Sequence, residues 1–151
     1  MNFELTQEQQ MIKKMTQEFA NDELLPDVVK RDIEKIWPKE QISKMADLGL
    51  LGMMVPPEWG GNGMDTISYA IAMEQISKID ASASVVMSVN NSLVCSIFQK
   101  YANDWQKEKY LKPLAKGEKL GCFSLSEPQS GSDASNMKTY AVQDGDDFVI
   151  S

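Results

Sequence analysis

The residues best suited to chemistry lie in one short run near the end of the 151-residue sequence. The run reads Cys122-Phe123-Ser124-Leu125-Ser126-Glu127, then Pro128-Gln129-Ser130-Gly131-Ser132-Asp133. It offers hydroxyls, two carboxylates and a glycine, which lets a backbone approach a ligand closely. A strand leading into an ordinary surface loop would have the same composition. Taken alone, the composition of the run favours a plain loop over a ligand site.

The sequence contains no histidine, which narrows the chemistry further. This excludes Ser-His-Asp and Cys-His nucleophilic catalysis and histidine-based zinc sites. The two cysteines, Cys95 and Cys122, lack the spacing of metal ligands, so we expect no metal site. Any chemistry must therefore use carboxylates, hydroxyls, backbone amides or a cofactor.

The charge balance argues against a polyanionic partner. With 15 basic and 22 acidic residues the net charge is −7, so we expect no nucleic-acid binding. The densest basic cluster, Lys107, Lys109 and Lys112, is interleaved with Glu108 and is typical of a solvated helix face. The polar N-terminus and the sparse cysteines favour a cytoplasmic location.

Helical patterns fill the first two-thirds of the sequence. Helix starts are indicated by paired side chains or caps, at Thr6 with Gln9, Pro38, Asp65, Asp80, and Asn103 with Gln106. Gly49 and Gly117 suit helix ends. Apolar residues recur at helical spacing in three stripes: Ile12, Met15 and Phe19; Ile42, Met45 and Leu48; Ile67, Ile71 and Ile76. A further short helix is expected around Val28 and Val29.

The stretch 81–99 carries no charge and resembles a membrane span in length. Its serines and asparagines would be costly in lipid, so we expect no membrane span. We predict a helix buried on most sides inside a globular protein.

The pattern changes after Gly117. Strands are predicted at Leu120–Ser126, Thr139–Val142 and from Phe148 onward, with a hairpin turn at Asp144-Gly145-Asp146. The predicted fold class is α+β: an all-helical domain over residues 1–117, then the start of a β-barrel-like domain over residues 118–151. Because the last strand stops with its apolar run, we expect the β-domain to be truncated.

The run Ser126-Glu127-Pro128 followed by Gly131-Ser132-Asp133 resembles the signature of the acyl-CoA dehydrogenase family, in its short-chain or butyryl type. The resemblance continues upstream through Trp59-Gly60-Gly61, Asn91-Ser92-Leu93 and Lys109-Tyr110-Leu111 in the family order, and covers essentially the whole sequence.

The resemblance implies a fold, a reaction and partners. Family members have a helical domain, a β-domain and a C-terminal helical bundle, which would be missing from this chain. They bind FAD, usually as homotetramers. They oxidise an acyl-CoA, here a short-chain one, to the trans-2-enoyl-CoA, and pass electrons to an electron-transfer flavoprotein.

The resemblance also implies site residues. FAD would contact Phe123, Leu125, Ser126, Gly131 and Ser132, with the Ser126 hydroxyl as a donor to the flavin. Substrate would contact Ser132 and a face of the buried helix formed by Val86, Val89 and Leu93, although plain core packing explains these three nearly as well. Ser88 and Asn90 could instead face a neighbouring helix.

No catalytic residue is expected within the chain. By resemblance Glu127 is structural. From their residue types, we expect Asp133 to fix the loop and Cys122 to be a small buried residue. The catalytic Glu would lie beyond residue 151, so the fragment alone should be inactive. The alternatives are an acyl-CoA oxidase or a flavin monooxygenase on the same scaffold, or a non-catalytic helical interaction module.

Overall fold

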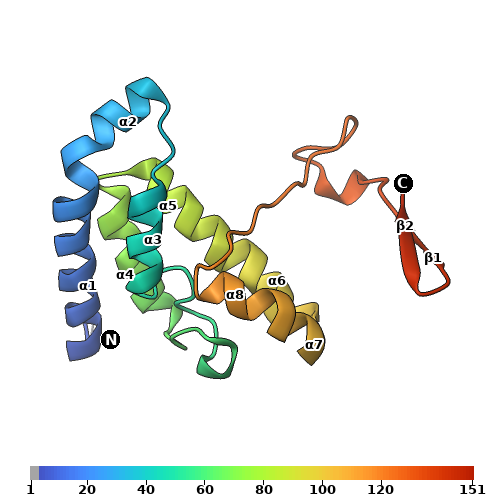
Figure 1. Cartoon of the computed structure of the whole chain (residues 1–151), viewed down its shortest axis with the longest axis horizontal. Helices are drawn as coiled ribbons and strands as arrows, with labels where there is room; N and C mark the ends of the chain where they lie inside the picture. The colour runs from blue at the N-terminus through green and yellow to red at the C-terminus, as the bar shows by residue number, and fades with distance from the viewer. Residues whose placement is uncertain (1–3) are drawn as a thin grey trace.

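The computed structural model describes residues 4–151 and shows a helical body from which the C-terminal segment extends (Figure 1). The α-helices are α1 (Gln7–Phe19), α2 (Val28–Glu34), α3 (Lys39–Asp47), α4 (Thr66–Ser77), α5 (Ala81–Ser88), α6 (Ser96–Tyr101), α7 (Asp104–Gln106) and α8 (Lys112–Ala115). Three π-helical segments join them: η1 (Ala20–Leu24), η4 (Val89–Cys95) and η5 (Lys107–Leu111). Short 3₁₀ turns form η2 (Leu25–Asp27), η3 (Pro57–Trp59) and η6 (Ala134–Asn136). The strands are β1 (Ala141–Asp144) and β2 (Asp147–Ile150).

Side-chain caps begin four of the helices, as the sequence predicts. Each cap oxygen accepts a backbone N–H three residues later, which satisfies a donor that has no partner within the helix. The caps are Thr6 and Asn103, both in reciprocal capping boxes, and Asp65 and Asp80. Gly49 and Gly117 follow α3 and α8 at φ +72° and +71°, as expected for helix-ending glycines.

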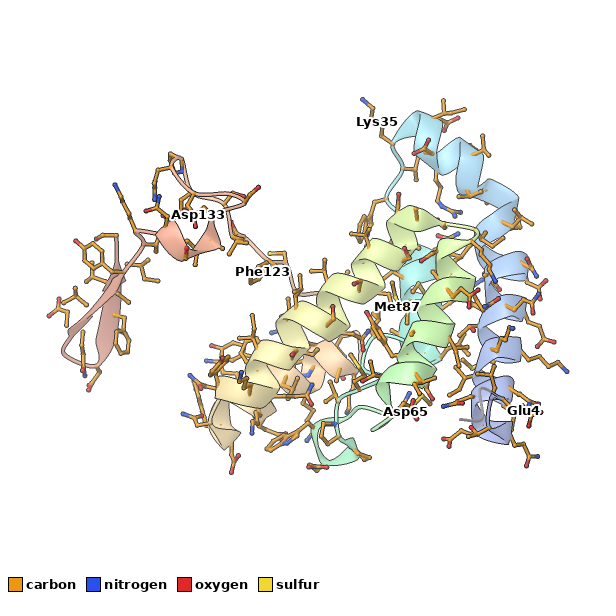
Figure 2. The ribbon with its side chains drawn as sticks, turned by 180° about the vertical axis from the view of Figure 1, so that it is seen from behind. Glu4, Lys35, Asp65, Met87, Phe123 and Asp133 are labelled. Atoms are coloured by element: carbon orange, nitrogen blue, oxygen red, sulfur yellow. The ribbon has the colours of Figure 1, made fainter. Side chains whose placement is uncertain are left out.

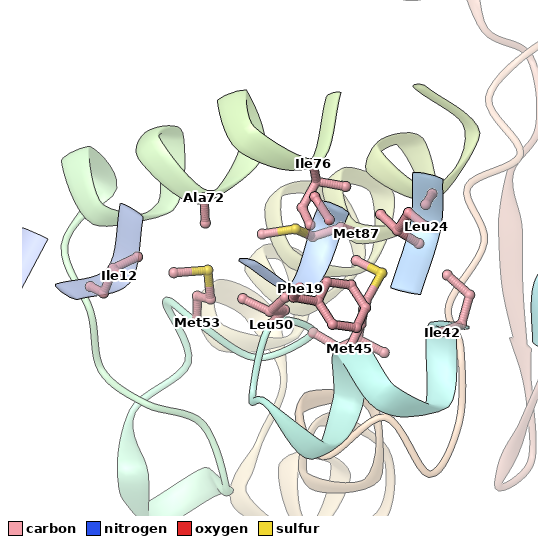
Figure 3. Packing of buried hydrophobic residues seen from close by; sticks show 13 residues of the cluster. Ile12, Phe19, Leu24, Ile42, Met45, Leu50, Met53, Ala72, Ile76 and Met87 are labelled. Carbon is pink, nitrogen blue, oxygen red and sulfur yellow. The ribbon is translucent and has the colours of Figure 1, made fainter. Parts of the chain in front are cut away.

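Apolar side chains from α1, α3, α4 and α5 form the larger of two cores (Figure 3). Leu24, Met45 and Ile76 are completely buried there. The smaller core joins η4 to η5 and α8, and its buried members are Val55, Val94, Cys95, Leu111, Leu114 and Ala115. The chain from α5 to α6 therefore touches both cores.

Three details of the predicted helices differ from the structure. Pro38 directly precedes α3 and is not its first residue. Leu48 and Ile67 are exposed, although Ile42, Met45, Ile71 and Ile76 are buried as expected. Leu48 lies just past the end of α3, and Ile67 is in the first turn of α4.

Residues Ala81–Tyr101 form one long helix through α5, η4 and α6. It has 21 residues and is long and apolar enough to span a membrane by length and composition alone. Only 39% of its most apolar window is buried, so the prediction of burial on most sides is wrong. One face packs on both cores, while the opposite face exposes Val85, Leu93 and Ile97.

The segment after α8 leaves the helical body, and its only described sheet is a β-hairpin (Figure 1). The predicted strand at Leu120–Ser126 is absent: this stretch is extended, but no described residue pairs with it as a strand. The hairpin pairs Val142 with Val149 and Asp144 with Asp147, which leaves Gly145 and Asp146 as the turn. Gly145 has φ +62°, as the first position of a tight hairpin turn requires.

Candidate functional site

The residues Cys122–Ser126 are exposed in an extended segment that leads away from the helical body. Their backbone amides have no hydrogen-bond partner among the described residues. Unpaired main-chain donors are costly only when they are buried without partners, and these donors are exposed. The segment can therefore pair with a further strand or with a ligand that has acceptor atoms along one edge.

The start of this segment is fixed to the long helix. The Gly121 backbone N–H donates to Asn90 Oδ1 at 3.0 Å. A Cβ at Gly121 would lie 2.5 Å from Val94 Cγ1, so the backbone rests directly on the helix. Both contacts are made by η4.

The Glu127 carboxylate organises the loop that follows. It accepts the backbone N–H groups of Lys138 at 2.7 Å and Thr139 at 3.0 Å, and the side-chain amide of Gln129. The hydrogen bond from Lys138, supported by those from Thr139, lowers the pKa of Glu127 to about 2. A carboxylate held this way is a poor proton acceptor, which agrees with the structural role expected for it.

The same loop is held internally by Ser130 and Asp133. Ser130 is buried, exchanges backbone hydrogen bonds with Glu127, and donates its hydroxyl to the carbonyl of Asp133 at 2.6 Å. The Asp133 carboxylate accepts the hydroxyl of Ser135, in keeping with a loop-fixing role. Gly131 and Ser132 lie at the exposed edge of this loop, and a Cβ on Gly131 would meet nothing within 4 Å.

The three helix residues expected at the substrate differ in burial. Val86 and Val89 are half-buried against the larger and the smaller core respectively. Leu93 is 39% exposed on the outer face of η4. Packing against the cores accounts for the apolar character of Val86 and Val89 in part, but it does not account for the exposed Leu93.

The structure brings only some of the predicted site residues together. Val89 and Leu93 share η4 with the Asn90 and Val94 contacts to Gly121, so the segment with Phe123 and Leu125 starts beside them. The loop with Gly131 and Ser132 lies farther out. Figure 2 shows Asp133 well away from Met87 on the long helix, with Phe123 between them.

Of two expectations about individual residues, one is wrong and one is confirmed. Cys122 is exposed, so its prediction as a small buried residue is wrong; Cys95 is the buried cysteine. The exposure follows from the missing strand pairing of the segment. Asn90 does face a neighbouring helix, because its Nδ2 donates to the carbonyl of Leu114 in α8; it also donates to the carbonyl of Leu51 and accepts the Gly121 N–H.

Sequence reasoning gave no specific role to the buried pair Asn90 and Asn91. Asn91 donates to the carbonyls of Leu50 and Met87 and accepts the Met53 N–H. The available signal was two adjacent amides in a helix without charge. Buried amides need several hydrogen-bond partners, and such a pair therefore indicates fixed contacts to backbone.

Known proteins resemble this chain over its whole length. The short-chain specific acyl-CoA dehydrogenase of Clostridium acetobutylicum is 40% identical over 151 residues, which is 100% of this chain and 40% of that protein. A solved structure described as an electron transferring flavoprotein of Acidaminococcus fermentans, in work on flavin-based electron bifurcation, matches with TM-score 0.94 and 43% identity, over 99% of this chain and 40% of that one. An acyl-CoA dehydrogenase from Bacillus anthracis, solved in complex with FAD, matches with TM-score 0.87 and 33% identity, over 97% of this chain and 25% of that one.

The chain thus spans at most about two-fifths of the length of these relatives. The likeness confirms the expected α+β class, in which a helical part leads into a β-part. The family model for the acyl-CoA dehydrogenase N-terminal domain matches residues 6–118, well over half of the sequence. The chain belongs to the acyl-CoA dehydrogenase family.

Proposed function

We propose that this chain is the N-terminal part of an FAD-dependent enzyme that oxidises a short-chain acyl-CoA to the trans-2-enoyl-CoA. The observation that carries the proposal is the exposed run Cys122–Ser126, whose backbone amides are unpaired among the described residues and which begins against the long helix. Similarity to a short-chain specific dehydrogenase supports the substrate class.

The donors in this run fit the edge of a flavin. Backbone N–H groups of Phe123, Leu125 and Ser126 and the Ser126 hydroxyl can donate to ring acceptors. When bound, FAD would accept the hydride from the substrate and gain negative charge on its ring, which fixed donors stabilise. The related protein from Bacillus anthracis was solved with FAD, which supports this cofactor.

The loop that follows offers room for a bound molecule. Because a Cβ on Gly131 would meet nothing within 4 Å, the protein itself does not require glycine there. An approaching ligand would, since glycine lets a backbone come closest. We assign Gly131 and Ser132 to contacts with FAD, and Ser132 also to the acyl-CoA.

The acyl chain is assigned to the long helix. Leu93 is exposed on η4 and Val86 and Val89 are half-buried on the same helix, so the three can present an apolar surface to a short aliphatic chain. A second part of the protein would have to cover this surface to exclude water from the reaction.

No residue in this chain is assigned as the base that removes the α-proton. The Glu127 carboxylate accepts two backbone amides and its pKa is lowered to about 2, so it would bind a proton weakly. We propose that a Glu from a part of the protein outside these 151 residues supplies the base. The 151-residue chain alone should then be inactive.

The domain organisation, the location, the oligomeric state and the electron acceptor are further parts of the proposal. Residues 1–117 would form the helical domain and residues 118–151 the beginning of the β-domain. The whole protein would be cytoplasmic and homotetrameric, and would pass electrons to an electron-transfer flavoprotein. The description of the Acidaminococcus fermentans structure supports that electron acceptor.

An anaerobic titration tests the proposal. The complete flavoprotein is mixed with butyryl-CoA and the loss of oxidised flavin absorbance is followed, with enoyl-CoA measured by chromatography. We expect bleaching and one enoyl-CoA per flavin. A flavin that no short-chain or medium-chain acyl-CoA reduces would overturn the proposal, and rapid peroxide formation in air would instead identify an oxidase.

A further inference from the structure

We propose that Asn90 is a positioning residue for the flavin, because it fixes the start of the flavin-contacting segment to the helix that carries the substrate face. This inference rests on the proposed function. The structure supplies the anchor, and the proposed function supplies the role of the segment that it anchors.

Asn90 uses its whole side-chain amide. It is completely buried and makes three hydrogen bonds of 3.0 Å or less: Nδ2 donates to the carbonyls of Leu51 and Leu114, and Oδ1 accepts the Gly121 N–H. One side chain thus ties η4 to the loop after α3, to α8 and to the outgoing segment. A buried amide held by three partners is restrained, because each partner that is lost leaves a donor or acceptor unsatisfied.

The anchored residue, Gly121, is close in the sequence to the residues that we propose contact the flavin. A chain advances at most about 3.6 Å per residue, so Phe123 lies within roughly 7 Å of Gly121 and Ser126 within roughly 18 Å, measured between Cα atoms. The contact of Gly121 with Val94 fixes the same point from the apolar side. A displacement of Gly121 would therefore displace the backbone N–H groups that we propose donate to the flavin.

The helix around Asn90 is π-helical instead of α-helical. Asn90 lies in the π-helical segment η4, together with Val89 and Leu93 of the proposed substrate face. π-Helical turns occur frequently at functional sites. One short segment of helix therefore holds both the substrate side chains and the flavin-segment anchor, which sets the distance between the two.

Asn91 provides a matched control. It is 1% exposed and also makes three hydrogen bonds of 3.0 Å or less, to Leu50, Met87 and Met53. None of these bonds reaches Gly121. Asn90→Ala and Asn91→Ala thus remove comparable bonds from the same helix, and only the first releases the segment.

The experiment compares Asn90→Ala, Asn91→Ala and Gly121→Ala in the complete flavoprotein. The measurements are the urea midpoint, the FAD dissociation constant, the flavin midpoint potential, and kcat and KM for butyryl-CoA. Both asparagine variants should lose stability to a similar extent. Of these two, only Asn90→Ala should weaken FAD binding, by about tenfold or more, and shift the potential.

Gly121→Ala keeps the Asn90 bonds to Leu51 and Leu114 but lifts the segment off Val94, so it should reproduce the flavin effect with a smaller loss of stability than Asn90→Ala. It also decides the question if Asn90→Ala does not fold. Equal flavin properties in the two asparagine variants, or wild-type flavin properties in Gly121→Ala, would overturn the inference.

Amide hydrogen exchange separates this inference from the proposed function. If the wild-type protein holds no FAD, the proposed function fails, while the anchor can still be measured. Exchange at Gly121 should accelerate at least tenfold in Asn90→Ala and stay unchanged in Asn91→Ala. Equal exchange in both variants would show that Asn90 fixes nothing.

Discussion

Glu127 Oε2 accepts the backbone N–H of Lys138 at 2.7 Å, across eleven positions of the chain. This bond, together with the hydrogen bonds from Thr139, lowers the pKa of Glu127 from its ordinary 4.5 to about 2. A lowered pKa means that the folded loop favours the ionised carboxylate. The stabilisation is therefore complete above the ordinary pKa and is lost as the pH falls through about 2.

The first prediction follows from this titration. Amide exchange protection at Lys138 and Thr139 should be constant near neutral pH and should fall as the pH is lowered from about 4.5 towards about 2. In Glu127→Gln the protection should be low at every pH, because the new amide cannot accept both N–H groups as a carboxylate does. Protection that persists in the Gln variant would show that other contacts hold the loop.

A second prediction concerns the Ser126 hydroxyl. Ser126→Ala should destabilise the reduced flavin relative to the oxidised one, by about 1–3 kcal/mol for a lost hydrogen bond at a site of developing charge. Thermal stability should hardly change, because Ser126 is exposed. Redox titration checks this, with Ser124→Ala as the control on the same segment; a potential equal to that of the wild type would remove the hydroxyl from the site.

The third prediction separates a glycine needed by the fold from one needed by a ligand. Gly131→Ala should leave the unfolding midpoint unchanged, since nothing lies within 4 Å of the added Cβ. FAD or acyl-CoA binding should weaken measurably. As a contrast, Gly61→Ala would place its Cβ 2.2 Å from the Val55 carbonyl and should destabilise the fold itself. Unchanged ligand affinity in Gly131→Ala would argue against a ligand at this loop.

The fourth prediction concerns the buried ion pair of Arg31 and Asp80. Their side chains are 8% and 5% exposed and are joined at 2.9 Å, and Asp80 also caps α5. Asp80→Ala leaves a buried unpaired charge and should cost about 3–5 kcal/mol in urea unfolding. Two further Arg31 nitrogens, Nε and Nη1, have no partner among the described residues, so the pair is imperfectly satisfied.

The double variant Arg31→Met with Asp80→Ser should recover most of that loss, because serine keeps the cap and methionine needs no partner. A double variant as unstable as Asp80→Ala would mean that neither the stranded charge nor the lost cap accounts for the loss.

The fifth prediction concerns thiol reactivity. Burial raises the pKa of Cys95 to about 12, while Cys122 is exposed. One thiol per chain should react with an aromatic disulfide reagent at mildly alkaline pH before unfolding, and two afterwards. Cys122→Ser should abolish the first reaction. Fast reaction of that variant would place Cys95 at the surface.

The features that could be predicted from the sequence are mostly local. Thr6, Asp65, Asp80 and Asn103 begin helices because each cap bond spans three residues, a relationship visible in the sequence itself. The turn at Gly145 is local in the same way. The signature around Ser126 indicated a family resemblance, and the match to the family model confirmed the family.

The features that could not be predicted depend on distant partners. A strand at Leu120–Ser126 needs a neighbour to pair with, and none of the described residues provides one. The same lack of a neighbour exposes Cys122. Asn90 reaches Leu51, Leu114 and Gly121, which lie 39, 24 and 31 positions away, so no local pattern could reveal its partners. The roles of the site residues themselves remain predictions.

The π-helical segment η4 gives the long helix a tolerance for the loss of one residue. A π turn holds one more residue than an α turn, so loss of one residue from Val89–Cys95 can be absorbed by a return to regular α-helix. Because the lost residue is the extra one of the π turn, the helix would stay continuous and α5 and α6 would keep nearly the same orientation. Loss of one residue from the regular helix α5 would instead turn its two sides by about 100° relative to each other. A single-residue deletion in α5 should thus separate the core packing of Ala83 and Met87 from the contacts of η4 with Gly121, whereas one in η4 should leave both nearly in place.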